Sequence, residues 1–227
     1  MPSTRALRHA AVGVATVLAA AAAVSGCGTT GPATSTNAAG VPVADVVATT
    51  TQLGDIVRNV GGDAVDVHQI LQPNTDPHEY EPRPDDVRAA ARAAVVFESG
   101  DGLDAWMGRI LGQAGGHPAV LDVSGTNVVR LPGETSGAEA SRYDPHWWHD
   151  PRNVAAAVPA IAAALTKANP AAARLYAANA ARYLTKVRRL DTAIAACMAK
   201  VPADRRRLVT GHDAFGYLAH RYGIRVV

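Results

Sequence analysis

Residues 43–71, VADVVATTTQLGDIVRNVGGDAVDVHQIL, decide the fold, because they contain a strand, a helix and a second strand in succession. Residues 43–48 and 65–71 are apolar runs of strand length. Between them, the apolar residues from Leu53 to Val60 recur at helical spacing, and two glycines follow. Two strands joined in this way by a helix favour a parallel sheet.

The same alternation continues along the chain. It predicts helices and strands in the order helix 83–93, strand 94–99, helix 103–116 and strand 119–124. A further apolar helix is expected over residues 151–170, with a kink at Pro159. We therefore expect residues 43–169 to form one α/β lobe, and ligands in such sheets bind at loops beyond the carboxyl ends of the strands.

One apolar seam runs from Tyr176 to Val201 with alternating spacings of four and three residues. It predicts a linker helix over residues 170–201, about 45 Å long at 1.5 Å per residue. Residues 202–227 then restart the order of strand, loop, helix and strand. We interpret them as the opening of a second α/β lobe, which this sequence truncates in mid-strand.

The first 26 residues are typical of an export signal. Arg5 and Arg8 precede an apolar run from Ala10 to Val24, which is too short for a comfortable membrane span. The run ends in VSGC, which resembles the lipobox of bacterial lipoproteins, in which the cysteine carries a lipid. Cys27 is then the expected lipid-attachment site, and the alternative is an ordinary thiol. Residues 27–42 read as a flexible tether.

Charge and motifs exclude several classes of function. The chain has 22 Lys and Arg against 20 Asp and Glu. Cleavage of the signal peptide would remove two arginines, so the mature chain would have no net charge. No basic stripe with interleaved aromatics is present, so nucleic acid is not an expected partner. The sequence also lacks a nucleophile elbow, a Walker loop and a dinucleotide-binding glycine motif.

Three histidines stand in loops that follow predicted strands. His78 lies in DPHEYEP (76–82), His146 in DPHWWHDP (144–151), and His212 follows LVTG. Proline before a histidine stiffens the loop, and neutral imidazole is the commonest protein ligand for metals. Three such loops in two lobes favour a metal site in a cleft. Taken singly, each histidine is more often a turn residue than a ligand.

Neighbouring residues are candidates for supporting roles. Asp76 and Asp144 can each accept the second ring N–H of the nearby histidine, or each can cap a turn. His149 forms H-x-x-H with His146, and we interpret it as a supporting or bystander residue. Cys197 lies on the apolar seam and is expected to be buried, or to pair with another cysteine.

The segments QPNTDPHEYEPRPDDV, YDPHWWHDPRNV and LVTGHDAFGYLAHRYGI resemble the three metal-site segments of the cluster A-I solute-binding lipoproteins. Members of this family deliver zinc or manganese to ABC importers. The resemblance runs from about Val43 to the end of the chain. It implies two α/β lobes, each with a mostly parallel sheet flanked by helices, joined by one long rigid helix.

The resemblance also implies roles for the histidines. His78, His146 and His212 would bind one ion per chain, and an acidic fourth ligand is expected beyond Val227. The family has glutamate at the third position in most manganese-type members, so His212 indicates zinc, with manganese as the alternative. His149 departs from the family, which usually has an apolar residue there.

The implied protein is a monomeric binder and not an enzyme. It would be exported, anchored through Cys27 to the bilayer at the outer face of the bacterial cytoplasmic membrane, and docked on an ABC permease. Two other classes stay open. A three-histidine zinc hydrolase would need a general base, for which Glu79 or Asp213 is the candidate. A surface adhesin would bind its partner without the histidines.

Overall fold

The computed structural model describes residues 35–137 and 139–227. Its main sheet has four parallel strands in the order β2-β1-β3-β4. The strands are β1 (Ala44–Ala48), β2 (Val65–Gln69), β3 (Val95–Glu98) and β4 (Ala119–Asp122). Their positions match the predicted strands, and the two central strands, β1 and β3, are mostly buried, as is typical of parallel sheets.

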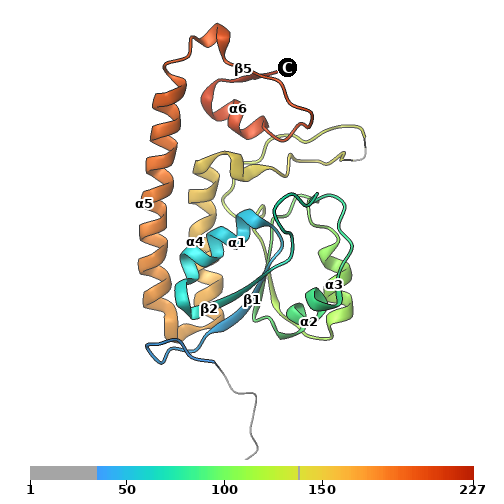
Figure 1. Ribbon diagram of the computed structural model, residues 1–227, viewed down its shortest axis with the longest axis vertical. Helices are drawn as coiled ribbons and strands as arrows, with labels where there is room; N and C mark the ends of the chain where they lie inside the picture. Colours follow the sequence, from blue (N-terminus) through green and yellow to red (C-terminus); the bar gives the residue numbers. More distant parts are fainter. Residues whose placement is uncertain (1–34, 138) are drawn as a thin grey trace, which may run out of the picture. The chain divides into compact units, whose positions relative to one another are not determined.

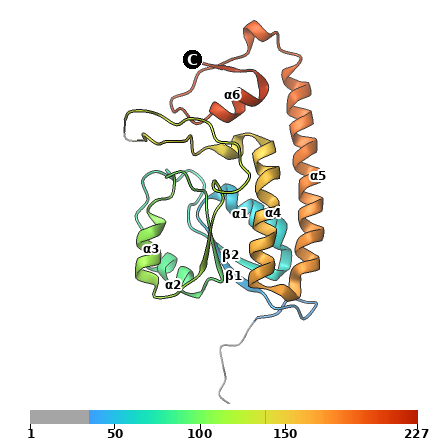
Figure 2. The same ribbon diagram turned by 180° about the vertical axis from the view of Figure 1, so that it is seen from behind.

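Helices cover both faces of this sheet (Figures 1 and 2). The helices are α1 (Thr51–Gly61), α2 (Pro84–Arg92), α3 (Met107–Ala114), α4 (Pro151–Ala168), α5 (Ala173–Met198) and α6 (Gly216–Tyr222). Short 3-10 turns are η1 (Gly62–Ala64), η2 (Trp147–His149), η3 (Pro170–Ala172) and η4 (Ala203–Arg205). Val46 of β1 packs with α1, α4 and α5, whereas Val47 packs with α2 and α3. Successive strand residues therefore face two separate cores.

The helix ends follow local chemistry. The Thr50 side chain accepts a hydrogen bond from the backbone N–H of Leu53, 3.2 Å away, and so caps α1. Gly62 ends that helix with φ +60°. Pro151 opens α4 behind the capping side chain of Asp150, and the helix continues through Pro159 to Ala168.

The long helix α5 stands beside α4 and extends past it (Figure 1). Its 26 residues span about 39 Å at 1.5 Å per residue. Tyr176, Ala180 and Val187 are buried in its first part, but Leu190 is 53 % exposed. Cys197 is exposed too, so its predicted burial was wrong. From Leu190 to the end of α5, the apolar seam is therefore not buried by other described residues.

Residues beyond α5 form a small parallel unit. Strands β5 (Arg207–Leu208) and β6 (Arg225–Val226) pair in parallel, and α6 connects them. This arrangement confirms the predicted strand, helix and strand. The unit is joined to the larger core, because the ring of Tyr217 in α6 is buried with the side chains of α1 and α4.

The predicted signal peptide (1–26) and Cys27 lie outside the described residues. Of the predicted tether, residues 35–42 form a turn, in which Asn37 Oδ1 accepts hydrogen bonds from the N–H groups of Ala39 and Val41. Asn169 Nδ2 donates to the Pro42 carbonyl over 2.6 Å and ties this turn to the end of α4. Within the described ranges, no helix is long and apolar enough to cross a bilayer.

Candidate metal centre

His78, His146 and His212 come together, although they lie in three separate segments of the chain. One ring nitrogen from each can be chosen so that all three lie within 4.8 Å of one another. The ring centroids of the three pairs are 5.1, 5.6 and 5.8 Å apart. The Nε2 atoms of His146 and His212 are 3.3 Å apart. Two nitrogens bound tetrahedrally to zinc at 2.0–2.1 Å would be separated by about 3.3–3.4 Å.

The loop after β2 holds His78 from both sides. Asp76 Oδ1 accepts a hydrogen bond from the His78 backbone N–H at 2.9 Å, and Trp106 Nε1 donates to the Pro77 carbonyl at 2.9 Å. After the histidine, the buried Tyr80 donates from its hydroxyl to Asp86 at the start of α2 over 2.6 Å. Asp76 therefore caps the turn, which was one of its two predicted alternatives.

Electrostatics favour the neutral form of His78. Burial lowers its pKa, although the nearby Glu139 carboxylate acts to raise it. His78 Nε2 is buried and has no hydrogen-bond partner among the described residues. A neutral imidazole with an unpaired ring nitrogen is in the form that a metal ion requires.

Asp144 orients His146. Its Oδ1 accepts hydrogen bonds from the backbone N–H of His146 at 2.9 Å and from ring Nδ1 at 2.8 Å. A proton held on Nδ1 leaves the lone pair on Nε2, the atom that faces His212. The next residue, Trp147, is fully buried and donates from Nε1 to the Ser99 carbonyl at 3.1 Å, which fixes η2 to the end of β3.

His212 lies between β5 and α6 and is the most exposed of the three, with 42 % of its side chain accessible. Its segment is placed by α6. The Tyr217 hydroxyl accepts from the Leu131 N–H at 3.0 Å and donates to the Asp144 carbonyl at 2.9 Å. Arg221 makes a bidentate pair with Asp191 of α5 at 2.8 and 2.6 Å. These contacts connect the His212 segment to both the His146 segment and α5.

His149, Glu79 and the neighbouring Glu81 lie outside the cluster. The ring of His149 packs against Phe215, with 4.9 Å between centroids, and burial lowers the pKa of His149 to about 4. Glu79 and Glu81 are exposed, and Glu81 lies 3.9 Å from Arg109. None of these three belongs to the group of converging ligand atoms.

Sequence reasoning missed Glu139. Its Oε2 lies 3.1 Å from His212 Nδ1 and 3.7 Å from His78 Nε2. The residue stands in a loop rich in Gly, Ala and Ser, and no motif or spacing marks it. Only the folded chain brings this carboxylate to the histidines.

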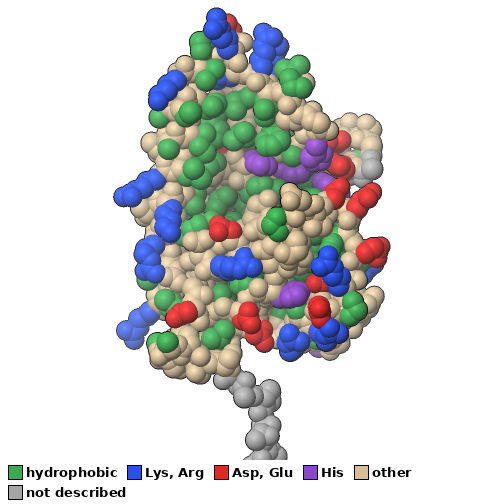
Figure 3. All heavy atoms as spheres, in the orientation of Figure 1, with side chains coloured by type: hydrophobic (Ala, Val, Ile, Leu, Met, Phe, Trp, Pro, Cys, Tyr) green, Lys and Arg blue, Asp and Glu red, His purple; other side chains and the backbone are tan. Residues whose placement is uncertain are grey.

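Two hollows meet at His78. An open one of about 670 Å³ is lined by residues that include Tyr80, Trp106 and Arg109. A smaller one of about 90 Å³ lies between His78 and His146, and its lining includes the acidic residues Glu134, Glu139, Asp144 and Asp213. Figure 3 shows histidine side chains at the surface below α6, next to acidic side chains. The smaller hollow is therefore an acidic approach to the cluster, which attracts cations.

The chain is similar to several known metal-binding proteins. Residues 46–227 match the model of the family described as "Zinc-uptake complex component A periplasmic". The iron-binding protein YfeA of Yersinia pestis is 31 % identical over 80 % of this chain and 58 % of its own length. The manganese-binding lipoprotein MntA of Halalkalibacterium halodurans is 32 % identical over 93 % of this chain and 67 % of its own length.

A solved structure shares the fold. The periplasmic zinc-binding protein TroA from Treponema pallidum superposes with a TM-score of 0.74 at 30 % identity, over 82 % of this chain and 66 % of that chain. The chain thus spans between 58 and 67 % of the length of these relatives. The names of the three proteins mention three different metals. The match over residues 46–227 shows that this chain belongs to the ZnuA family of metal-uptake binding components.

Proposed function

We propose that this protein captures a divalent transition metal, zinc foremost, outside the cytoplasmic membrane and delivers it to the permease of an ABC importer. His78, His146 and His212 would hold one ion per chain. The observation that carries this proposal is the convergence of three ring nitrogens within 4.8 Å, from three segments that the fold brings together. Family membership and the metal-binding names of the relatives support it.

The ligand chemistry favours zinc. Imidazole nitrogen suits zinc, whereas manganese prefers carboxylate and other oxygen ligands. The 3.3 Å separation of the His146 and His212 Nε2 atoms also suits a tetrahedral ion. Manganese is the second candidate, because MntA is named as a manganese-binding lipoprotein and the Glu139 carboxylate lies beside the rings.

The three histidines differ in how they are held, which suits capture and release of an ion. His146 is buried, with 6 % of its surface accessible, and its ring is fixed by Asp144, whereas His212 is half-exposed. The ion would first bind His78 and His146, whose loops are already held in place. His212 would then complete the site from the solvent side. Release to the permease would reverse this order, with His212 leaving first.

Location and partners complete the proposal. Export and lipid attachment through Cys27 would hold a monomer at the outer face of the cytoplasmic membrane, close to its permease. The lobe of residues 43–169, the linker 170–201 and the second lobe that opens at 202 remain predicted boundaries.

A competition experiment tests this function. The purified chain is dialysed against chelator-buffered zinc and manganese together, and bound metal is counted. We expect one zinc per chain, and a loss of zinc affinity of more than about 100-fold in His212→Ala, because a ligand should matter more than the outer partners that cost 10- to 100-fold.

The matched control is His220→Ala, an exposed histidine of α6 outside the cluster. This variant should bind zinc as the unaltered chain does. A preference for manganese would overturn the assignment of zinc. Failure of the unaltered chain to hold any metal, or equal binding by His212→Ala, would contradict the shared site.

A further inference from the structure

The segment that carries Glu139 folds back on itself as a hairpin, described over residues 131–137 and 139–144. Its two sides pair through the antiparallel bridge between Pro132 and Tyr143. Backbone hydrogen bonds connect Ser141 N–H to the Glu134 carbonyl at 3.0 Å and Asp144 N–H to the Leu131 carbonyl at 3.0 Å. Glu139 lies on the returning side of this hairpin, five residues before Asp144.

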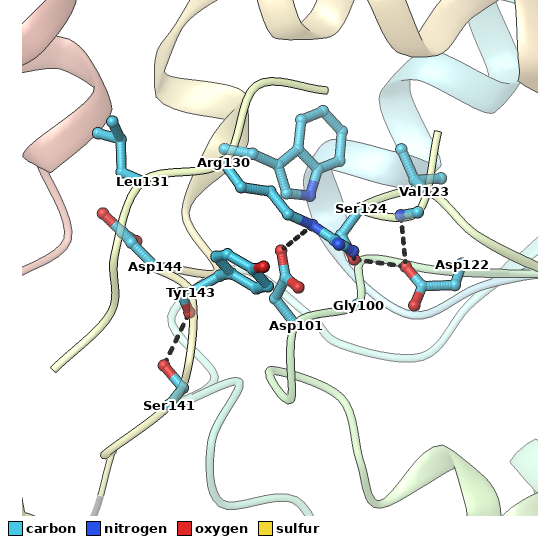
Figure 4. A network of polar contacts seen from close by, with 12 residues as sticks. Gly100, Asp101, Asp122, Val123, Ser124, Arg130, Leu131, Ser141, Tyr143 and Asp144 are labelled. Carbon is cyan, nitrogen blue, oxygen red and sulfur yellow. Dashed lines mark hydrogen bonds and ion pairs between the residues drawn. The ribbon is translucent and has the colours of Figure 1, made fainter. Parts of the chain in front are cut away.

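A polar network fastens the base of the hairpin to the sheet (Figure 4). Arg130 Nε lies 3.1 Å from Asp101 Oδ2, and its Nη2 donates to Ser124 Oγ at 2.8 Å. Ser124 in turn donates to Asp122 at the end of β4 over 2.7 Å. The guanidinium also lies over the Tyr143 ring, 4.9 Å from its centroid. Both sides of the hairpin are therefore held where they leave the protein core.

The hairpin brings the Glu139 carboxylate to the exposed face of the histidine cluster. Oε2 is 3.1 Å from His212 Nδ1, which is within reach of a charge-assisted hydrogen bond. The opposite nitrogen of that ring, Nε2, faces His146 at 3.3 Å. The Glu139 side chain is only 33 % exposed, so water screens this pair less than it screens a fully exposed ion pair.

The Glu139 carboxylate approaches Nδ1 of His212, the same ring nitrogen that Asp144 contacts in His146. There, Asp144 accepts from Nδ1 and Nε2 is left to face the cluster. In both histidines a carboxylate contacts Nδ1, whereas Nε2 faces the neighbouring histidine. Such carboxylate partners fix the tautomer and raise the basicity of a metal-binding imidazole.

We propose that Glu139 is a positioning residue that accepts the Nδ1 proton of His212 and so presents Nε2 of that ring to the metal. This inference rests on the proposed function, which makes His212 a ligand. The 131–144 hairpin then has a specific role. The hairpin belongs to the first lobe, and it supplies the Glu139 carboxylate that orients His212, the metal ligand in the second lobe.

Zinc affinity and the proton position of His212 test the assignment together. In the purified chain, Glu139→Ala should weaken zinc binding about 10- to 100-fold, the usual cost of removing such a partner. Glu139→Gln should lose less, because its amide oxygen still accepts a hydrogen bond. Glu134→Ala is the matched control, since Glu134 is an acidic residue of the same hairpin and lines the same small hollow. It should change zinc affinity less than about 2-fold, because its carboxylate is not among those paired with the rings.

Nitrogen NMR of the metal-free chain supplies a readout that a purely structural role would not move. We expect the His212 proton on Nδ1 in the unaltered chain and in Glu134→Ala, and a shift toward Nε2 in Glu139→Ala. Unchanged zinc affinity and an unchanged tautomer in Glu139→Ala would overturn the assignment while leaving the proposed function intact. If the unaltered chain bound no zinc, the proposed function would fail and the role in metal binding with it, although the NMR measurement would still decide the contact.

Discussion

Replacing Tyr217 by phenylalanine isolates one hydroxyl that connects three segments. This hydroxyl accepts from Leu131 N–H at 3.0 Å and donates to the Asp144 carbonyl at 2.9 Å, and only 2 % of the residue is exposed. Burial raises the pKa of Tyr217 to about 12, so the hydroxyl keeps its proton at neutral pH. Its removal leaves two backbone groups without these partners. At about 0.5–1.5 kcal/mol for each hydrogen bond, the free energy of unfolding should fall by about 1–3 kcal/mol.

That loss is measurable by thermal and urea unfolding followed by circular dichroism. For a chain of this length, 1 kcal/mol lowers the melting temperature by about 2–4 °C, so we expect a decrease of roughly 4–8 °C for a loss near 2 kcal/mol. Tyr183→Phe is the control, because the Tyr183 hydroxyl donates a hydrogen bond to Asp55 at 3.1 Å in an exposed position. It should cost less than about 0.5 kcal/mol. Equal effects of the two substitutions would refute the idea that the Tyr217 hydroxyl holds α6 to the His146 segment.

Two further substitutions test the backbone and the pH dependence. In Gly100→Ala, the new Cβ would lie 1.9 Å from Asp122 Oδ1 at φ +86°, so urea unfolding should show a loss of roughly 2–4 kcal/mol. Gly102 has a similar φ of +89°, but a Cβ there would meet open space, so Gly102→Ala should lower the free energy of unfolding by only about 1 kcal/mol. Equal losses in the two variants would contradict the clash at Gly100. Burial lowers the pKa of His149 from 6.5 to about 4 in the folded chain. Between these pH values the unfolded chain therefore binds more protons than the folded chain, so the free energy of unfolding falls as the pH drops through this window. His149→Phe should lessen the decrease in the urea midpoint between pH 7 and pH 4.5, and an undiminished decrease would show that His149 is not its source.

The main sheet was predictable because its signals are local. The apolar runs at 43–48 and 94–99 became β1 and β3, whose residues are buried against both helical layers. The seam of α5 was also predicted, but its packing was not. Cys197 shares the periodicity of Tyr176, yet burial depends on what lies opposite, and periodicity carries no information about that.

The site was predictable only in part. The repeated Asp-Pro-His marked His78 and His146 as special, because proline stiffens a loop in any fold. Nothing local marked Glu139, since its contact with His212 depends on the hairpin at 131–144 and on the docking of α6. The roles of Asp76 and Asp144 also needed coordinates, because the same Asp-Pro-His sequence caps a backbone N–H in one loop and binds a ring nitrogen as well in the other.

The separation of the histidines along the chain has a kinetic consequence. His146 and His212 are 66 residues apart, and His212 belongs to the small unit that follows α5. Contacts between such distant segments are costly to form early in folding. Zinc should therefore bind after the folding transition state, and at 100 times its dissociation constant it would add about 2.7 kcal/mol to the native state alone. If the chain carries zinc as proposed, the loaded protein should unfold roughly 100-fold more slowly while folding at an unchanged rate, so the ion would protect the protein from unfolding for as long as it stays bound.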